Sequence, residues 1–240
     1  MIDVVAGDCA PEEIPAALAA AGEMFGDDFF ERFGFEDPEA RWRAWLRQDP
    51  GSLILLHCSK EQRREVFTEP PGDDDDIIGM LLSVVPIGDY ARALYEGEMR
   101  PGSVGRILSV EQPYELVRVP HTFRHMHLCA AGLRTGRLLP ERRLTLLHSL
   151  MEVCRRRIMV WWNTPMPVRF VTAYPADDLG RRLLERAGFS EVDDAGRKSG
   201  MEIPLYRLNL DPDWLSRLAA PLRQARRSGT RTVVRTRRLG

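Results

Sequence analysis

The chain alternates between short apolar runs and longer segments whose apolar residues recur every three to four positions. Short apolar runs bounded by turn residues are typical of buried strands, and the longer periodic segments are typical of helices. The pattern predicts strands over 1–7, 52–59, 76–88, 121–131, 168–175, 189–192 and 203–210. It predicts helices over 11–26, 37–51, 139–157 and 176–188, and it permits another over 89–99. Strands and helices in this order predict a mixed sheet with helices on its faces.

Two of the predicted helices carry further local signals. Asp37 is a good N-cap, Pro38 fits the first turn, and Pro50 with Gly51 ends the same helix. In the helix over 139–157, a set of apolar residues at helical spacing predicts the buried face. These residues are Leu144, Leu147, Leu150, Met151 and Cys154.

Composition narrows the class of protein. With 240 residues and 44% hydrophobic content, the chain can bury one sizeable core. No apolar run approaches the roughly 20 residues that span a bilayer, and the acidic start is unlike a signal peptide. The four cysteines form no CxxC pair, which argues against a zinc ribbon or a disulfide framework. We therefore expect a cytoplasmic protein without a membrane segment.

Charge is unevenly distributed around a net value of −1. Residues 73–76 are four consecutive aspartates, and residues 222–240 hold seven arginines and no acid. Such runs are usually solvated, and an arginine-rich segment also permits contact with nucleic acid.

The stretch "HTFRHMHLCAAG" (121–132) holds three of the five histidines. On a strand, alternate side chains share a face, so His121, His125, His127 and Cys129 are expected on one side of the sheet. Two imidazoles at this spacing suit a metal ion, which would need a third ligand. A structural role, with the histidines hydrogen-bonded, and a catalytic role are the alternatives.

The second half of the chain resembles the GNAT superfamily of acyl-CoA-dependent N-acyltransferases. The resemblance is strongest over 168–210, where a helix ends "RRLLERAGF" and a late strand reads "PLYRLNL". It implies an α/β (α+β) fold with a mixed, mostly antiparallel central sheet and helices on both faces. It also implies one domain over 1–210, interrupted by an insertion at 89–120 and followed by a basic C-terminal extension at 211–240.

Two regions of the sequence depart from the family pattern: the phosphate loop and the helix over 176–188. Its phosphate loop, Arg/Gln-x-x-Gly-x-Gly/Ala, corresponds here to "AAGLRTGRLLPERR" (130–143), whose spacing differs. In this stretch the resemblance assigns Arg134, Gly136 and Arg137 to the CoA pyrophosphate. The tyrosine that usually protonates the thiolate is replaced by Leu184, and the asparagine near the start of that helix by Asp177.

The resemblance further implies how an acyl group would move. The strand at 121–131 would diverge from the strand at 168–174, leaving room for the pantetheine arm. The backbone N–H groups of Cys129 and Ala130 would polarise the thioester oxygen. His125 or His127 would deprotonate a primary amine that attacks directly in a ternary complex.

Alternatives remain at three points. Glu111 and Glu115 are alternative bases that would act through water. The acceptor is a small molecule or a protein, and acetyl-CoA or another acyl-CoA is the co-substrate; no metal is expected in the site. Two rival functions remain. One is a catalytically silent binding or regulatory protein, and the other is a nucleic-acid-associated module that uses the arginine-rich tail.

Overall fold

The computed structural model describes residues 3–69, 76–107, 124–192, 203–211, 213–214 and 231–234. Within these ranges one sheet has the strand order β6-β7-β5-β4-β3-β2-β1-β8. Its strands are β1 (Asp3–Asp8), β2 (Leu53–Cys58), β3 (Ile77–Val84), β4 (His125–Leu133), β5 (Phe170–Ala173), β6 (Ser190–Glu191), β7 (Tyr206–Asn209) and β8 (Arg231–Val234).

The helices are distributed over both faces of this sheet. They are α1 (Ile14–Phe25), α2 (Phe29–Arg32), α3 (Pro38–Gln48), α4 (Arg63–Val66), α5 (Gly88–Glu96), α6 (Pro140–Trp162) and α7 (Asp178–Arg186). Short 3-10 turns are η1 (Pro11–Glu13), η2 (Pro50–Ser52), η3 (Lys60–Gln62) and η4 (Pro101–Arg106). In the described ranges, no helix combines the length and apolar character needed to cross a membrane.

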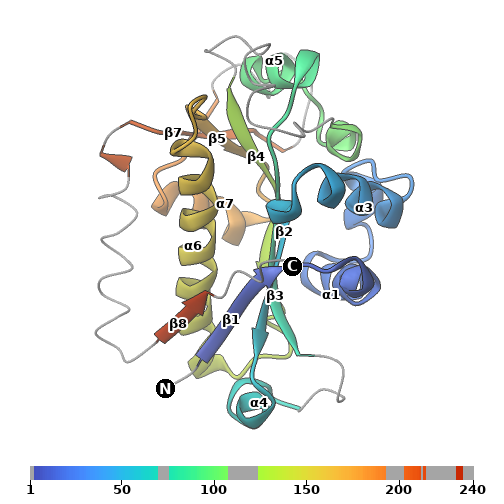
Figure 1. Cartoon of the computed structure of the whole chain (residues 1–240), viewed down its shortest axis with the longest axis vertical. Coiled ribbons are helices and arrows are strands. Elements are labelled where there is room, and N and C mark those ends of the chain that lie inside the picture. The colour runs from blue at the N-terminus through green and yellow to red at the C-terminus, as the bar shows by residue number, and fades with distance from the viewer. Residues whose placement is uncertain are drawn as a thin grey trace.

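The fold class expected from the sequence is confirmed. The β4–β5 and β1–β8 pairs are parallel, and the other described strand pairs are antiparallel. Figure 1 shows α6 and α7 on one face of the sheet and α1 and α3 on the other. The local signals also act as expected, since Asp37 caps α3 by accepting a hydrogen bond from the Ala40 N–H at 2.9 Å.

Each face has its own packed core. Beneath α1–α3, an aromatic cluster that includes Phe29, Trp42 and Trp45 covers β3 and β4. Beneath α6 and α7, Met126, Val171 and neighbouring apolar residues fill the opposite side. These two layers hold β4 near the centre of the sheet, so most of its side chains are buried, and Ala131 is exposed.

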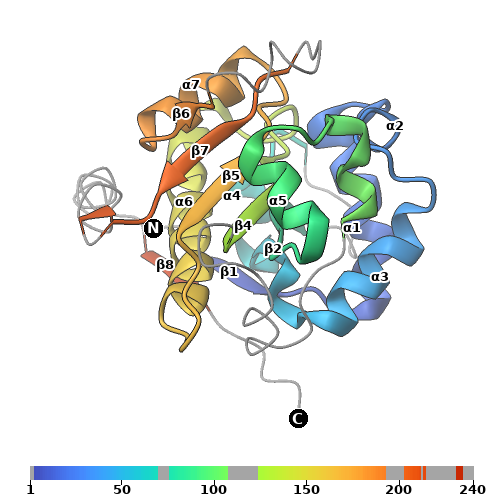
Figure 2. The same cartoon turned by 90° about the horizontal axis from the view of Figure 1, so that it is seen from above.

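The basic C-terminal segment contributes a strand that the sequence pattern does not predict. Residues Arg231–Val234 form β8, which pairs in parallel with Asp3–Ala6 of β1 at one edge of the sheet (Figure 2). The other residues of the arginine-rich tail lie outside the described part of the chain. This short strand covers the edge that β1 would otherwise leave open.

The connection between β3 and β4 contains the helix that the sequence permits over 89–99. It forms α5, which ends at a left-handed Gly97, and then η4. In Figure 1, α5 lies at the top of the sheet and α4 at the bottom. The rest of the predicted insertion, 108–120, lies outside the described residues.

Candidate active site

Strand β4 has different neighbours on its two sides. On one side it pairs with β3 from His127 to Leu133. On the other side it pairs with β5 for four residues, ending where Leu128 lies opposite Ala173. Beyond that pair β5 ends, while β4 continues to Leu133. All four residues of β5 pair with β4, so the divergence of the two strands that the resemblance implies stays a prediction. Within the described residues, the β5 side of Cys129–Leu133 has no strand partner.

A β-bulge lies at the same point of β4. Leu82 pairs with Ala130 and Ser83 pairs with Leu128, which leaves Cys129 as the extra residue between them. A bulge bends its strand and turns the backbone N–H groups away from the regular ladder. The bulge and the end of the β5 pairing therefore coincide at Cys129.

The two candidate histidines share one face of β4, as the alternation predicts. Both are buried, and His127 lies in register between Val84 of β3 and Thr172 of β5. Its Nδ1 is 2.9 Å from the Thr172 hydroxyl oxygen. Which of these atoms donates depends on the imidazole tautomer. The hydrogen bond holds the ring one residue before the pairing with β5 ends.

Burial keeps His127 neutral. Desolvation, with a smaller contribution from the neighbouring His125, lowers the pKa of His127 to about 3. Burial also raises the pKa of the Cys129 thiol far above neutrality. A neutral imidazole and an un-ionised thiol therefore stand together at this part of the strand.

The loop that follows β4 uses its basic residues in the fold. Arg134 is 3% exposed and makes a bidentate ion pair with Glu23 of α1, at 2.8 and 3.0 Å. Its remaining terminal nitrogen donates to the Ile77 carbonyl at 3.2 Å. Arg137, which is 46% exposed, reaches the same Glu23 carboxylate at 2.8 Å. One carboxylate from α1 thus occupies both arginines that the resemblance assigns to pyrophosphate.

The backbone donors of this loop are also occupied. The N–H groups of Thr135, Arg137 and Leu138 donate to carbonyls within 133–135, and that of Leu139 donates to Val66 at 2.9 Å. Within the described residues, Gly136 is the residue between 135 and 139 whose N–H has no backbone acceptor. The assignment of Arg134, Gly136 and Arg137 to the pyrophosphate stays a prediction, and it requires both guanidinium groups to leave Glu23.

Comparisons with known proteins give matches among solved structures. No family model and no curated protein sequence matches the chain. An apo mutant of agmatine N-acetyltransferase matches with a TM-score of 0.51 and 16% identity, covering 87% of this chain and 100% of that one. The chain has the GNAT fold. A polyamine N-acetyltransferase of Drosophila melanogaster (TM-score 0.48, 16% identity, 87% and 100% covered) and a mosquito arylalkylamine N-acetyltransferase-like protein (0.45, 11%, 86% and 100%) also match.

Within this GNAT fold, the positions of α7 that depart from the family pattern have structural roles. Asp177 is the N-cap of α7, and its carboxylate accepts a hydrogen bond from the Gly180 N–H at 2.6 Å. Leu184 packs against the apolar cluster beneath α6 and α7. Neither residue supplies a proton donor for a thiolate.

Sequence reasoning did not single out Tyr174, which lies where the β5 pairing with β4 ends. It follows β5 directly, and its ring meets the His127 ring edge-on with 5.7 Å between centroids. The buried hydroxyl donates to the Met99 carbonyl, and burial raises the pKa of the Tyr174 hydroxyl. Its place at the end of "VRFVTAY", just before Pro175, is the signal that could have identified it.

The metal alternative finds no third ligand in the described ranges. There, no group of three His, Cys, Asp or Glu side chains is arranged to hold an ion. His121, Glu111 and Glu115 lie outside the described residues. The candidate active site is therefore built from His125, His127, the bulge at Cys129 and Ala130, and Tyr174.

Proposed function

We propose that the protein transfers an acyl group, acetyl by default, from acyl-CoA to a primary amine. The observation that carries the proposal is the coincidence, at Cys129, of the β4 bulge and the end of the β5 pairing. Backbone groups on the β5 side of Cys129–Leu133 are free of a strand partner within the described part of the chain. An amide-containing arm such as pantetheine can form hydrogen bonds along such an edge.

The bulge would supply the electrostatic part of the reaction. When an amine attacks a thioester, negative charge develops on the carbonyl oxygen, and fixed N–H donors stabilise that charge. The N–H groups of Cys129 and Ala130 are our candidates, since Cys129 is the bulged residue and Ala130 is the residue at which pairing with β3 resumes. The C–N bond forms, the C–S bond breaks, and the thiolate leaves.

Proton transfer is assigned to the histidine face. The attacking amine gives up one proton, and His127 or His125 is the proposed acceptor, because a neutral imidazole has a free lone pair. The low pKa of buried His127 makes it a weak base until a polar substrate enters beside it. The thiolate would then take its proton from water, since the usual tyrosine position holds Leu184.

A covalent intermediate on the protein is not part of the proposal. Burial raises the pKa of the Cys129 thiol, so the thiolate required of a nucleophile is scarce at neutral pH. Direct attack in a ternary complex needs no such group. The agmatine N-acetyltransferase that shares the fold supports an amine as the acceptor class.

Isothermal titration with acetyl-CoA and with longer acyl-CoAs tests the first half of this proposal. We expect saturable binding of at least one acyl-CoA, followed by amine-dependent release of free CoA thiol when a panel of primary amines is added. CoA lacking its thiol serves as the matched control for binding without chemistry. Failure of every acyl-CoA to bind would overturn the proposal.

The occupied loop favours a second candidate function. If Glu23 keeps Arg134 and Arg137, the chain is a GNAT-fold protein that binds a partner or ligand without transferring acyl groups. The release of free CoA thiol with the panel of amines separates the two candidates, because this alternative predicts no turnover with any amine.

A further inference from the structure

A cavity of about 600 Å³ lies between α3 and the segment that joins β3 to β4. Its walls come from the turn between α2 and α3, from α3 itself, from Tyr90 of α5 and from the end of η4. The residues that line it include none from β4 or β5, so the cavity is separate from the candidate active site. Its volume lies within the usual range for small-molecule sites.

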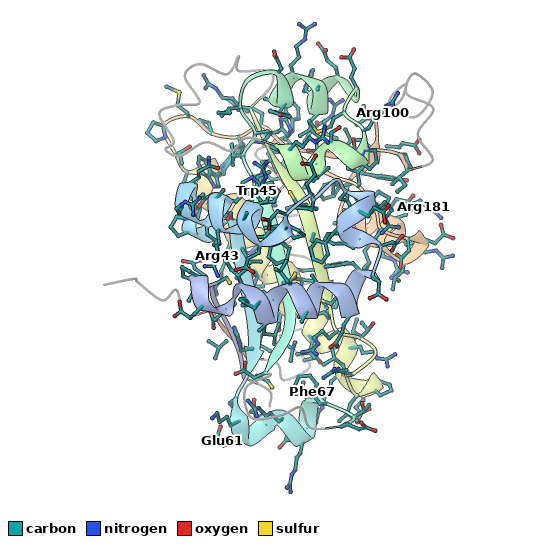
Figure 3. All side chains as sticks on the ribbon, turned by 90° about the vertical axis from the view of Figure 1, so that its right-hand side faces the viewer. Arg43, Trp45, Glu61, Phe67, Arg100 and Arg181 are labelled. Atoms are coloured by element: carbon teal, nitrogen blue, oxygen red, sulfur yellow. The ribbon has the colours of Figure 1, made fainter. Side chains whose placement is uncertain are left out.

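The walls are held by tight contacts between distant parts of the chain. The Gly105 N–H donates to the Phe33 carbonyl at 2.8 Å, and the Trp45 Nε1–H donates to the Ile107 carbonyl at 3.0 Å. Figure 3 labels the Trp45 side chain. Gly34 has a φ of +73°, and a Cβ there would overlap the Gly102 carbonyl oxygen. The two sides of the cavity are therefore docked backbone to backbone, which fixes its shape.

Small residues on α3 make the room. Ala40 and Ala44 are one helical turn apart and both line the cavity, with Tyr90 among the residues of the opposite wall. Larger side chains at these two positions would fill the space. The lining thus offers a solvent-accessible apolar patch, in which Ala40 is exposed, and one aromatic ring.

Four charged residues surround this apolar patch, two of each sign. Arg106 pairs with the exposed Glu36 at 2.6 Å, and the Asp37 carboxylate caps α3. Among the described residues, Arg41 has no carboxylate within ion-pair distance. A purely anionic ligand would be repelled by the carboxylates of Glu36 and Asp37, and a purely cationic ligand would be repelled by both arginines. A ligand with one charge of each sign satisfies both sets.

We propose that this cavity binds a zwitterionic amino acid or short peptide. The ligand's carboxylate lies on the Arg41 guanidinium, and its ammonium group lies at Asp37 and Glu36. Arginine suits the first role because its planar fork matches a carboxylate. The proposal does not depend on acyl transfer, since the site is separate from β4 and β5.

Binding of the dipeptide Ala-Ala and of two blocked derivatives tests this assignment. N-acetyl-Ala-Ala lacks the ammonium group, and Ala-Ala amide lacks the carboxylate. We expect Ala-Ala to shift the backbone amide resonances of Ala40, Ala44 and Gly105, and each blocked derivative to bind at least tenfold more weakly, since each loses a charge-assisted contact. Equal binding of all three probes, or no shift at these amides, would overturn the proposal.

Two variants assign the ends of the ligand. Arg41→Gln should weaken Ala-Ala about tenfold and leave the amide derivative unchanged, because that derivative has no carboxylate to lose. Asp37→Asn keeps a good helix cap and should weaken Ala-Ala while sparing the N-acetyl derivative. The matched control is Arg43→Gln: Arg43 lies on the same helix, pairs with Glu39 and does not line the cavity. If Arg41→Gln binds Ala-Ala like the parent, the assignment is wrong.

Discussion

The second half of β4 and the loop that follows it differ in how they use their backbone and charges. In Cys129–Leu133 the β5 side is without a strand partner among the described residues, and a bulge interrupts the ladder. In the loop at 134–139 most N–H groups have acceptors, and both arginines share the Glu23 carboxylate. The region expected at the thioester thus has an open strand edge, meaning one without a strand partner among the described residues, whereas the arginines expected at the pyrophosphate are occupied.

This difference shows which part of the candidate site also stabilises the fold. Arg134 connects α1, the start of β3 and the loop after β4, so its ion pair and hydrogen bond hold three elements together. The N–H groups of Arg134 that stabilise the fold in this way can bind a ligand only if the ligand replaces Glu23 in the ion pair. Acyl transfer here would rely more on β4 and less on a preformed phosphate cradle.

The largest expected effect concerns the open region. If His127 accepts the amine proton, His127→Ala should lower turnover by about 10²–10⁴-fold, the usual loss for a positioned base. Acyl-CoA affinity should stay near the parent value, because the imidazole acts on the acceptor. Turnover and titration on His127→Ala and His125→Ala measure both quantities.

Two controls keep this prediction separate from other roles of the histidines. A metal site would give bound zinc in the purified protein and sensitivity to a chelator. A purely structural role would lower the melting temperature of both variants without selective loss of turnover. Variants that fold normally and turn over at the parent rate would refute the catalytic assignment.

The second prediction uses acid to test how deeply His127 is buried. The folded protein protonates His127 only near pH 3, whereas the unfolded chain does so near its ordinary pKa of 6.5. Between these values the unfolded state binds more protons, so the free energy of unfolding falls as the pH drops. One such proton contributes about 1.4 kcal/mol per pH unit. Above pH 6.5 the contribution is constant.

Comparison with a variant isolates this proton from others. His127→Gln removes the titrating group, so its free energy of unfolding should fall less steeply than the parent's between pH 6.5 and 4. Carboxylates with lowered pKa values, such as Glu152 and Asp76, lose stabilisation in acid in both proteins and cancel in the difference. Urea denaturation at each pH measures the free energy of unfolding of both proteins. If it falls equally steeply with pH in the two, His127 is instead protonated in the folded state.

How far the sequence predicts this molecule depends on the range of the interactions. Alternation along the predicted strand 121–131 puts His125 and His127 on one face, and both are buried, while Asp37 correctly marks the start of α3. The Glu23–Arg134 pair joins residues 111 positions apart, and no local pattern encodes it. The bulge likewise depends on the register between β3 and β4.

The predicted buried face of α6 is partly wrong for a related reason. Leu144 is 66% exposed, whereas Leu146, Leu150 and Val153 are buried. The buried side of α6 also takes Arg157, which pairs with Asp49. Charged residues that have partners also lie on the buried face of α6. A prediction from apolar spacing alone does not count them, and it therefore places the buried face at the wrong angle around the helix.

The third prediction tests the occupied loop through stability. Arg134→Gln should reduce the free energy of unfolding by about 1–3 kcal/mol, since it removes charge-assisted bonds from a buried group. Arg137→Ala removes an exposed pair and should change it by at most ~1 kcal/mol. Urea denaturation of both variants checks the contrast. Equal effects would mean that Arg134 does not anchor α1 to the loop.

The smallest expected effect decides whether the loop still serves acyl-CoA. Glu23→Gln removes the charge that holds Arg134 and Arg137 but keeps the size of the side chain. If the loop binds pyrophosphate once those arginines are released, affinity for acyl-CoA should rise about three- to tenfold, because the phosphate no longer competes with a carboxylate. In the Arg137→Ala background this gain should shrink, since one of the two released cations is gone.

Glu12→Gln, on the turn before α1 and without an arginine partner among the described residues, is the matched charge control. Titration with acetyl-CoA measures the parent and the four variants: Glu23→Gln, Arg137→Ala, the double variant and Glu12→Gln. An affinity that Glu23→Gln leaves unchanged would mean that the phosphates bind away from 134–139, and that the open half of β4 works with a different anion site.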